Sequence, residues 1–275
     1  MGGLNSLVRE RGMLMAPYYE AALNILGVTG TIIPLGDYRH GQPNATTLTS
    51  VGAEQTTWTW SEAPNAFATP LDLTSEDNWQ GIIPVISLNG TDEDIDTPDI
   101  TYYSRGDSSN DNVMSVGMWI NKTAAAGDYL FDKWGSVNAK EWALRIDGSN
   151  LLRLDLYDES LDLSPYRISD AAILTVEQWV FVVATYTGAG GSSAAAGIVL
   201  YANGAAVAST ANEQGSYVAM ENVNSLPTLF SRGDGAAFYG GKVAGGAMGP
   251  FFAQVTLTAD QVKRLYNLGR AAMGL

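Results

Sequence analysis

Apolar side chains recur at every second position through much of the chain, which is the pattern of half-buried β-strands. In residues 113–120 four apolar side chains share one face: Met114, Val116, Met118 and Ile120. Residues 140–147 and 151–158 alternate in the same way, which places Glu141, Arg145 and Asp147 on the polar face of the first run. Residues 179–187 are apolar at nearly every position and predict a central strand that is covered on both sides.

Turn signals separate these runs. Gly148, Ser149 and Asn150 lie between two of them, and Asn203-Gly204 follows the alternating residues 198–202, as is typical of a β-hairpin. Residues 188–197 contain only Gly, Ser and Ala and predict a flexible loop, whereas the Gly-rich residues 240–249 predict a closely packed strand. Residues 31–88 are irregular, with a short alternating piece at 56–60. The pattern therefore predicts an all-β fold, a two-sheet antiparallel β-sandwich.

Helical patterns occur only at the two ends of the chain. Pro17 suits a first helical position and Gly27 a helix stop, while the residues between them carry an apolar stripe: Tyr19, Ala22, Leu23 and Leu26. A helix of roughly ten residues is marginal alone, so it must dock on its own body or on a neighbouring subunit. We therefore divide the chain into a short helical arm, residues 1–30, and a sandwich domain, residues 31–275. Thr258 and Gln261 have capping-box spacing and predict a short C-terminal helix.

The order of strand motifs resembles the laminin-G-like branch of the concanavalin A-like lectin/glucanase jelly rolls. The pieces are Leu88-Asn89-Gly90-Thr91-Asp92-Glu93-Asp94, Ser115-Val116-Gly117-Met118-Trp119-Ile120, Leu130-Phe131-Asp132-Lys133, Trp142-Ala143-Leu144, Gln178-Trp179-Val180-Phe181-Val182-Val183-Ala184-Thr185-Tyr186, Leu200-Tyr201-Ala202-Asn203-Gly204 and Leu257-Thr258. The resemblance is clearest over residues 85–270 and implies two curved antiparallel sheets with a short terminal helix. Residues 34–38 could supply the first strand of the family. The Gly-rich residues 240–249 depart from the acidic strand that the family has at this point.

Composition excludes several classes of function. A formal net charge of −14 repels phosphate backbones, so we expect no nucleic-acid partner. The absence of cysteine excludes disulfides, zinc-thiolate sites, Fe–S clusters and thiol nucleophiles, and His40 is the only histidine. No segment resembles a signal peptide or reaches the roughly 20 apolar residues of a membrane span, so we expect synthesis in a cytoplasm and no membrane partner.

Acidic residues offer the candidate sites. Asp92, Asp94 and Asp96 would share one strand face, but the outer positions lack the Glu residues of the glucanase motif, and Pro98 ends any strand there. With Asp99, these residues could instead supply oxygen ligands to calcium. Asp107, Asn110 and Asp111 are a second calcium candidate. We expect no catalytic residue and no other cofactor.

The tryptophans divide into two groups. Trp142 and Trp179 occupy core-facing strand positions, and Trp119 points away from the Met114–Ile120 face. Four others lie in or near predicted loops, where they could stack on a sugar or anchor an interface: Trp58, Trp60, Trp79 and Trp134.

These observations favour a non-enzymatic structural or interaction protein. A sandwich related to sugar-binding folds, without a secretion signal and with an apolar arm, suits a virion released by lysis, as a phage head decoration (cement) or tail component. Its partners would be further copies of itself and other virion proteins. The arm would contact neighbours through five residues: Pro17, Tyr18, Tyr19, Leu23 and Leu26. The alternative is a lectin-like carbohydrate-binding module, with or without calcium, and a glycosidase ranks last.

Overall fold

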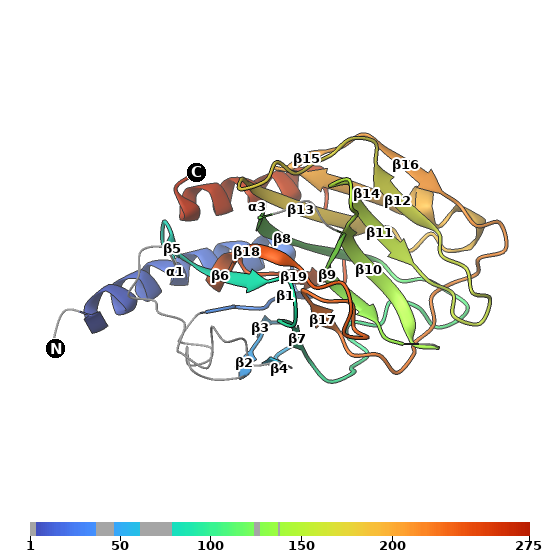
Figure 1. Ribbon diagram of the computed structural model, residues 1–275, viewed down its shortest axis with the longest axis horizontal. Helices are drawn as coiled ribbons and strands as arrows, with labels where there is room; N and C mark the ends of the chain where they lie inside the picture. The colour runs from blue at the N-terminus through green and yellow to red at the C-terminus, as the bar shows by residue number, and fades with distance from the viewer. Residues whose placement is uncertain (1–3, 37–46, 61–78, 124–126, 137) are drawn as a thin grey trace.

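Two antiparallel β-sheets form the body of the protein, which we describe from a computed structural model covering residues 4–36, 47–60, 79–123, 127–136 and 138–275 (Figure 1). One sheet has ten strands and the other nine among these residues, and every pairing between neighbouring strands is antiparallel. The predicted two-sheet sandwich is therefore confirmed.

The ten-stranded sheet is here named the back sheet. Its strands follow the spatial order β15 (Ala205–Ala206), β14 (Ile198–Ala202), β13 (Trp179–Tyr186), β8 (Met114–Lys122), β18 (Gly240–Ala244), β6 (Ile83–Asn89) and β5 (Trp79–Gln80). The strand β19 (Phe251–Ala253) pairs with β8 on the same edge as β18 does. It also pairs with β1 (Gly30–Ile32), and β1 pairs in turn with β3 (Val51–Gly52). The strand β1 precedes the segment 34–38 suggested by the resemblance, and residues 37 and 38 lie outside the described residues.

The nine-stranded sheet is named the front sheet. Its spatial order is β16 (Ser209–Asn212), β12 (Tyr166–Ser169), β11 (Leu152–Leu156), β10 (Lys140–Ile146), β9 (Asp128–Trp134), β17 (Thr228–Leu229), β7 (Ile95–Asp96), β4 (Thr57–Trp60) and β2 (Thr47–Thr49). Short 3-10 turns lie at Gly191–Ser193, Ala195–Gly197 and Gly246–Met248 (η4).

The core lies between the two sheets. Met114, Val116 and Met118 of β8 are fully buried on the inner side of the back sheet, as the alternation predicts. Across the layer, Trp142 of β10 stacks on Phe252 of β19 with ring centroids 5.5 Å apart. Burial of such rings contributes the largest apolar areas of the core.

Two of the loop tryptophans also belong to the core. Trp58 and Trp60, which we placed near exposed loops, are 0% and 5% exposed because β4 alternates buried and exposed residues. Trp58 packs edge-on against Phe131, with centroids 5.8 Å apart. Trp179 deviates in the opposite direction. It begins β13 and is only half-buried, packed against the core from its edge, so the prediction that it is a core residue is only partly correct.

Hairpin and capping signals are confirmed. Asn203 and Gly204 both have positive φ, 51° and 76°, as a type I′ turn requires, and they join β14 to β15. The C-terminal helix α3 (Ala259–Met273) begins at a capping box in which Thr258 and Gln261 bond each other's backbone N–H groups. Among the described residues, no helix is long and apolar enough to span a bilayer.

The N-terminal helix is longer than predicted. The helix α1 (Leu4–Leu26) has 23 residues and runs through Pro17, so Pro17 is not its first residue. A proline inside a helix removes one backbone hydrogen bond, but the flanking turns can still form. Gly27 has φ 83° and its N–H bonds the carbonyl oxygen of Leu23, which confirms the predicted helix end.

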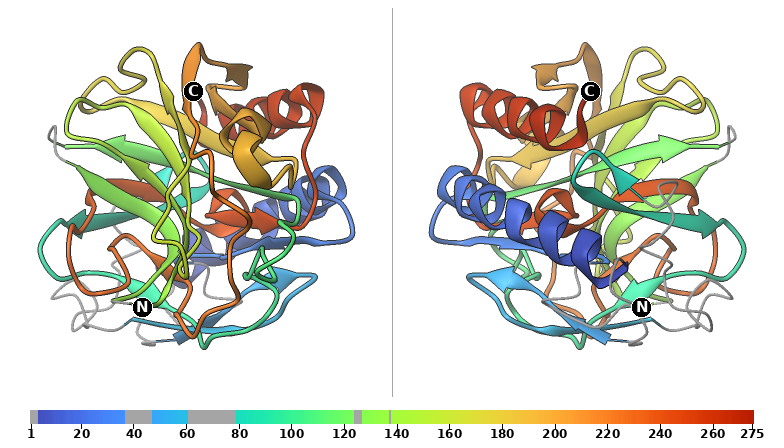
Figure 2. Two further views of the ribbon diagram at one scale, coloured as in Figure 1. Left: turned by 90° about the vertical axis from the view of Figure 1, so that its right-hand side faces the viewer. Right: turned by 90° about the vertical axis from the view of Figure 1, so that its left-hand side faces the viewer.

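Both described α-helices pack on the back sheet and on each other (Figure 2). In α3, Tyr266 stacks on Trp119 of β8, which confirms that Trp119 points away from the core between the sheets. The helix α1 lies against β1, η4 and α3. Gly245 and Gly249 flank η4, and a Cβ at either residue would come within 2.1 Å of a backbone oxygen of residue 33 or 35. The Gly-rich residues 240–249 therefore pack closely, as predicted.

Replacement of Gly269 by alanine tests the close packing of α3 against Trp119 of the back sheet. A Cβ at this residue would lie 2.3 Å from Nε1 of Trp119, a large buried side chain, so we expect Gly269→Ala to destabilise the fold by ~1–3 kcal/mol. Gly215→Ala is the control, since a Cβ at residue 215 would have nothing within 4 Å of it. Denaturant unfolding measures the stability of both variants, and equal stability would contradict the close packing of α3 against Trp119.

Candidate functional site

The four aspartates proposed as calcium ligands do not converge. The Asp92 carboxylate accepts a hydrogen bond from the Asn89 amide at 2.8 Å, Asp94 is buried and accepts one from the Ser231 hydroxyl at 2.5 Å, and Asp99 pairs with the Lys133 ammonium at 3.0 Å. Asp96 lies in β7, paired with β4 and β17. Over the residues that the structure describes, no three Asp, Glu, His or Cys side chains are placed to hold one metal ion. These aspartates therefore do not form a shared set of ligands in this fold, and calcium binding by them stays a prediction.

The carboxylates of the second calcium candidate also have separate partners. The Asp107 carboxylate caps its own turn by accepting the backbone N–H groups of Ser109 and Asn110. The Asp111 carboxylate is buried and accepts the hydroxyls of Tyr186 and Tyr217, at 2.5 and 2.9 Å. His40 lies outside the described residues, as do the side-chain surroundings of Trp79.

Most of the predicted arm interface faces the chain's own body. Tyr19 and Leu26 are 6% and 1% exposed against the back sheet and α3, so the prediction that they contact a neighbour is wrong. Tyr18 and Leu23 pack partly on the same core, and Pro17 is exposed. The apolar stripe was correctly identified, but the sandwich itself covers it.

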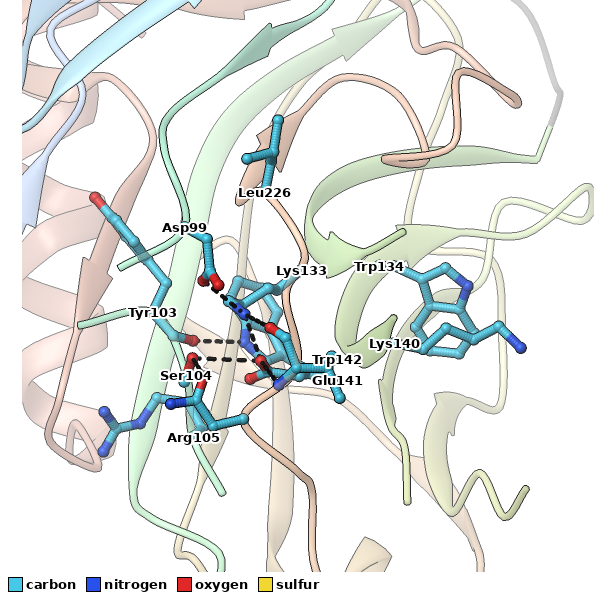
Figure 3. A network of polar contacts seen from close by, with 12 residues as sticks. Asp99, Tyr103, Ser104, Arg105, Lys133, Trp134, Lys140, Glu141, Trp142 and Leu226 are labelled. Carbon is cyan, nitrogen blue, oxygen red and sulfur yellow. Dashed lines mark hydrogen bonds and ion pairs between the residues drawn. The ribbon is translucent and has the colours of Figure 1, made fainter. Parts of the chain in front are cut away.

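A buried charge network lies at one end of the sandwich (Figure 3). The Glu141 carboxylate and the Lys133 ammonium are both fully buried and form an ion pair, and Lys133 also donates to the Val223 carbonyl oxygen at 2.7 Å. Ser104 donates to Glu141 at 3.3 Å. The sequence pattern placed Glu141 on the polar outer face, which is wrong, because the pairing of β10 with β9 shifts between Lys140 and Trp142. A bulge at this position turns the Glu141 side chain inward.

This network fastens an irregular segment that covers the end of the sandwich, residues 217–225, here named the strap. Three carboxylates from separate parts of the chain each accept one of its backbone N–H groups. The pairs are Asp158 with Val218 at 3.1 Å, Asp111 with Met220 at 2.7 Å, and Glu141 with Val223 at 3.1 Å. Hydrogen bonds to charged acceptors are stronger than neutral ones, so the carboxylates substitute for sheet pairing along the strap.

Burial raises the pKa of Glu141 to about 7, although the Lys133 ammonium acts in the opposite direction. Burial also raises the pKa of Asp111. The Glu141 side chain is fully buried, so we assign it a structural role in holding the strap.

A different surface combines aromatic and cationic side chains in the open. The arginine–tyrosine face consists of Tyr129, Arg145, Arg153, Tyr166 and Arg232, on the outer side of the front sheet. The strand registers place Tyr129 beside Arg145 and Arg145 beside Arg153, in adjacent positions of β9, β10 and β11. Both α-helices cover the other sheet, so no helix that the structure describes covers this side of the sandwich (Figure 2).

The guanidinium groups of this face are held in place by rings and carboxylates. The Arg153 guanidinium carbon lies 3.3 Å from the Tyr166 ring centroid, and those of Arg145 and Arg232 lie 5.6 and 5.9 Å from that of Tyr129. The Asp155 carboxylate, 2% exposed, accepts from both Arg145 and Arg153. Arg145, Arg153 and Arg232 remain 22%, 18% and 34% exposed.

Donors remain on these guanidinium groups. Each carries five N–H donors, whereas Asp155 takes one nitrogen of Arg145 and two of Arg153, and Asp234 takes one nitrogen of Arg232. Stacking on a ring leaves the edge of a guanidinium free to bind an oxyanion in a bidentate manner. Arg145 was assigned correctly to the polar face, but no signal in the sequence indicates that its neighbours across the strands are tyrosine and a second arginine.

A glutamine at residue 141 tests the buried network. In the folded chain Glu141 is ionised and paired with Lys133 only above about pH 7, whereas in an unfolded chain it ionises near pH 4.5. The folded state therefore loses stability as the pH rises through this window. We expect Glu141→Gln to lose less stability than the wild type between pH 5 and pH 8, by ~1–3 kcal/mol. Thermal unfolding at both pH values measures this difference. Glu20→Gln, on the exposed side of α1, is the control, and identical pH profiles for the Glu141 variant and the wild type would contradict the assignment.

Comparison with known proteins adds to this geometry. Similar solved structures include the botulinum neurotoxin serotype D ligand binding domain in complex with N-acetylneuraminic acid, at 12% identity and TM-score 0.56, covering 90% of this chain and 52% of that one. The botulinum neurotoxin serotype G binding domain gives 12% identity and TM-score 0.55, covering 89% and 52%. Trypanosoma rangeli sialidase in complex with sialic acid gives 12% identity and TM-score 0.52, covering 89% and 33%.

The chain thus spans about half the length of the toxin domains that it matches, and identities of 12% indicate a shared fold only. No curated protein sequence matches it. A family model described as the concanavalin A-like lectin/glucanases superfamily matches residues 89–245, which is more than half of the 275 residues and lies within the range of the resemblance. The sandwich, its terminal helix and this match agree, and the chain belongs to the concanavalin A-like lectin/glucanases superfamily.

Proposed function

We propose that the protein binds carbohydrate and that the arginine–tyrosine face is the surface that holds it. The observation that carries this proposal is the preorganised set of guanidinium groups, Arg145, Arg153 and Arg232, fixed on tyrosine rings over the open sheet. Ligands gain affinity when the groups that bind them are already ordered, because less conformational entropy is lost.

The chemistry of this face suits an acidic sugar. Tyr129 offers an aromatic surface for the apolar side of a pyranose ring, and the N–H edges of Arg145 and Arg232 flank it to receive a carboxylate. Trp134 extends the aromatic surface, since its ring lies 6.5 Å from that of Tyr129. The face therefore combines stacking with charge-assisted hydrogen bonds.

The similar structures support this proposal as analogies. The serotype D domain and the trypanosomal sialidase are each described in complex with a sialic acid, which is a carboxylated sugar. Proteins that contain this fold are thus described with acidic sugars, and the residues named here supply a chemical reason for this chain to bind one. The Glu141 network does not form an open carboxylate pair, so the proposal is for binding without hydrolysis.

The second candidate is the predicted assembly role, as a virion component. The amino-terminal turns of α1 reach past the edge of the sheets, which favours contact with another molecule at this end of the helix (Figure 1). The two roles are compatible, because this end of α1 and the front sheet are separate surfaces.

Titration with an acidic and a neutral trisaccharide tests the carbohydrate proposal. We expect the protein to bind sialyllactose more tightly than a neutral trisaccharide of the same length. Loss of one charge-assisted hydrogen bond costs ~1.5–3 kcal/mol, so Arg145→Gln and Arg232→Gln should each weaken binding by roughly 10- to 100-fold. Isothermal calorimetry measures the affinities.

Arg264→Gln removes an equal charge from the exposed side of α3 and serves as the matched control. Full affinity in both front-sheet variants, or the absence of binding across a panel of sialylated and uronic-acid glycans, would refute the proposal.

Removal of residues 1–13 tests the assembly role. We expect the full chain to sediment as an oligomer and the shortened chain as a monomer, and thermal unfolding shows whether the shortened chain is folded. Analytical ultracentrifugation distinguishes the two, and a monomeric full chain would count against assembly through this helix.

A further inference from the structure

A groove lies on the opposite side of the sandwich from the arginine–tyrosine face. It is bounded by the start of β13, the β14–β15 turn and the last turns of α3, and its volume is about 500 Å³. Small-ligand pockets typically measure roughly 300–1,000 Å³, so the groove has room for one or two sugar rings. Its lining residues are Trp119, Glu177, Gln178, Trp179, Asn203, Tyr266, Arg270 and Leu275.

The floor of the groove is rigid. Trp119 and Tyr266 stack with centroids 5.5 Å apart and planes at 15°, and Phe181 packs against Trp119. Glycines permit this approach, since a Cβ at Gly204 would lie 2.8 Å from Tyr266 and one at Gly269 would lie 2.3 Å from Trp119. The stacked rings therefore need not rearrange to receive a ligand.

The rim offers a ring together with hydrogen-bonding groups. Trp179 is only half-buried at the first position of β13, which leaves part of its indole facing the groove. Asn203 accepts the backbone N–H of Phe181 at 3.1 Å through its Oδ1, so its amide N–H groups can serve a ligand. Gln178 and Glu177 are exposed beside Trp179 and add donors and a carboxylate acceptor.

The groove has one carboxylate and one guanidinium, so its side chains give no net positive charge to attract an acidic sugar. The Glu177 carboxylate lies on the rim, and the Arg270 guanidinium donates one hydrogen bond to the main-chain oxygen of Leu275 at 2.8 Å and lies 5.8 Å from the Tyr266 ring. A carboxylate acceptor beside amide donors matches adjacent hydroxyl groups, which both donate and accept. An aromatic side chain at the same rim suits the apolar face of a pyranose.

We propose that this groove is a second carbohydrate site, which takes an uncharged hexopyranose ring stacked on Trp179 with its hydroxyls bonded by Glu177, Gln178 and Asn203. The site does not depend on the function proposed for the front sheet. With both sites occupied, one molecule would bind sugars on two opposite faces and could bridge two glycan chains, which raises avidity without any new contact.

The test is titration of the full chain with neutral disaccharides, namely maltose, lactose, cellobiose and mannobiose, followed by calorimetry and tryptophan fluorescence. We expect at least one to bind. Trp179→Ala should weaken that binding at least tenfold and Glu177→Gln and Gln178→Ala severalfold, while Leu161→Ala, at an exposed side chain outside both proposed sites, should leave it unchanged. Thermal unfolding establishes whether each variant is folded. If Trp179→Ala does not fold, Glu177→Gln and Gln178→Ala provide the test.

Two results overturn this second site: no disaccharide binds, or neutral binding persists in the folded groove variants. The two proposals fail separately. Loss of acidic-sugar binding in Arg145→Gln with intact disaccharide binding supports both sites, whereas loss of disaccharide binding in that variant would place the neutral sugar on the front sheet and overturn the groove.

Discussion

The end of this sandwich depends on hydrogen bonds that backbone N–H groups donate to carboxylates. Irregular segments have no neighbouring strand to satisfy their polar backbone atoms, and a buried unsatisfied group costs ~1–3 kcal/mol. Three backbone N–H groups of the strap instead donate hydrogen bonds to the carboxylates of Asp111, Glu141 and Asp158, which lie in three separate parts of the chain. The desolvation of Glu141 that this requires is offset in part by Lys133, which is equally buried.

The two outer faces of the sandwich differ in the side chains that they carry. The back sheet has the apolar side chains Trp119, Phe181 and Phe251 on its outer side, and these require the cover that α1 and α3 provide. The front sheet instead has Arg145 and Arg153 with tyrosines, which can face water and can also hold a polar ligand. The cover on one side therefore determines where large ligands have access, and the groove occurs where the cover ends.

The strands of this fold could be predicted because their side chains alternate over five or more residues, as in β8, β10 and β11, or are apolar at nearly every position, as in β13. Shorter strands carried less information. The four residues of β4 alternate, yet the sequence predicts Trp58 and Trp60 only in or near loops, because turn residues surround this short piece. The direction of Glu141 could not be predicted, since a single shift in strand pairing reverses the face on which a residue lies and leaves no mark in the local sequence.

The proposed sites differ in the same respect. The aspartates at 92, 94, 96 and 99 form a conspicuous run in the sequence, but each has a different partner in the fold. The arginine–tyrosine face joins residues from four strands and one loop, whose proximity depends on strand order. Sequence periodicity indicated which of these side chains point outward, and only the three-dimensional registers brought them together.

The anchoring of the strap has a consequence for local opening. Segments outside sheets usually exchange their amide hydrogens with solvent rapidly, because small fluctuations expose them. The amides of Val218, Met220 and Val223 are instead held by carboxylates that belong to the body of the sandwich. Their deuterium uptake should therefore be as slow as that of strand amides, while Ala219 and Asn222 between them exchange faster, so that the strap opens together with the sandwich and not before it.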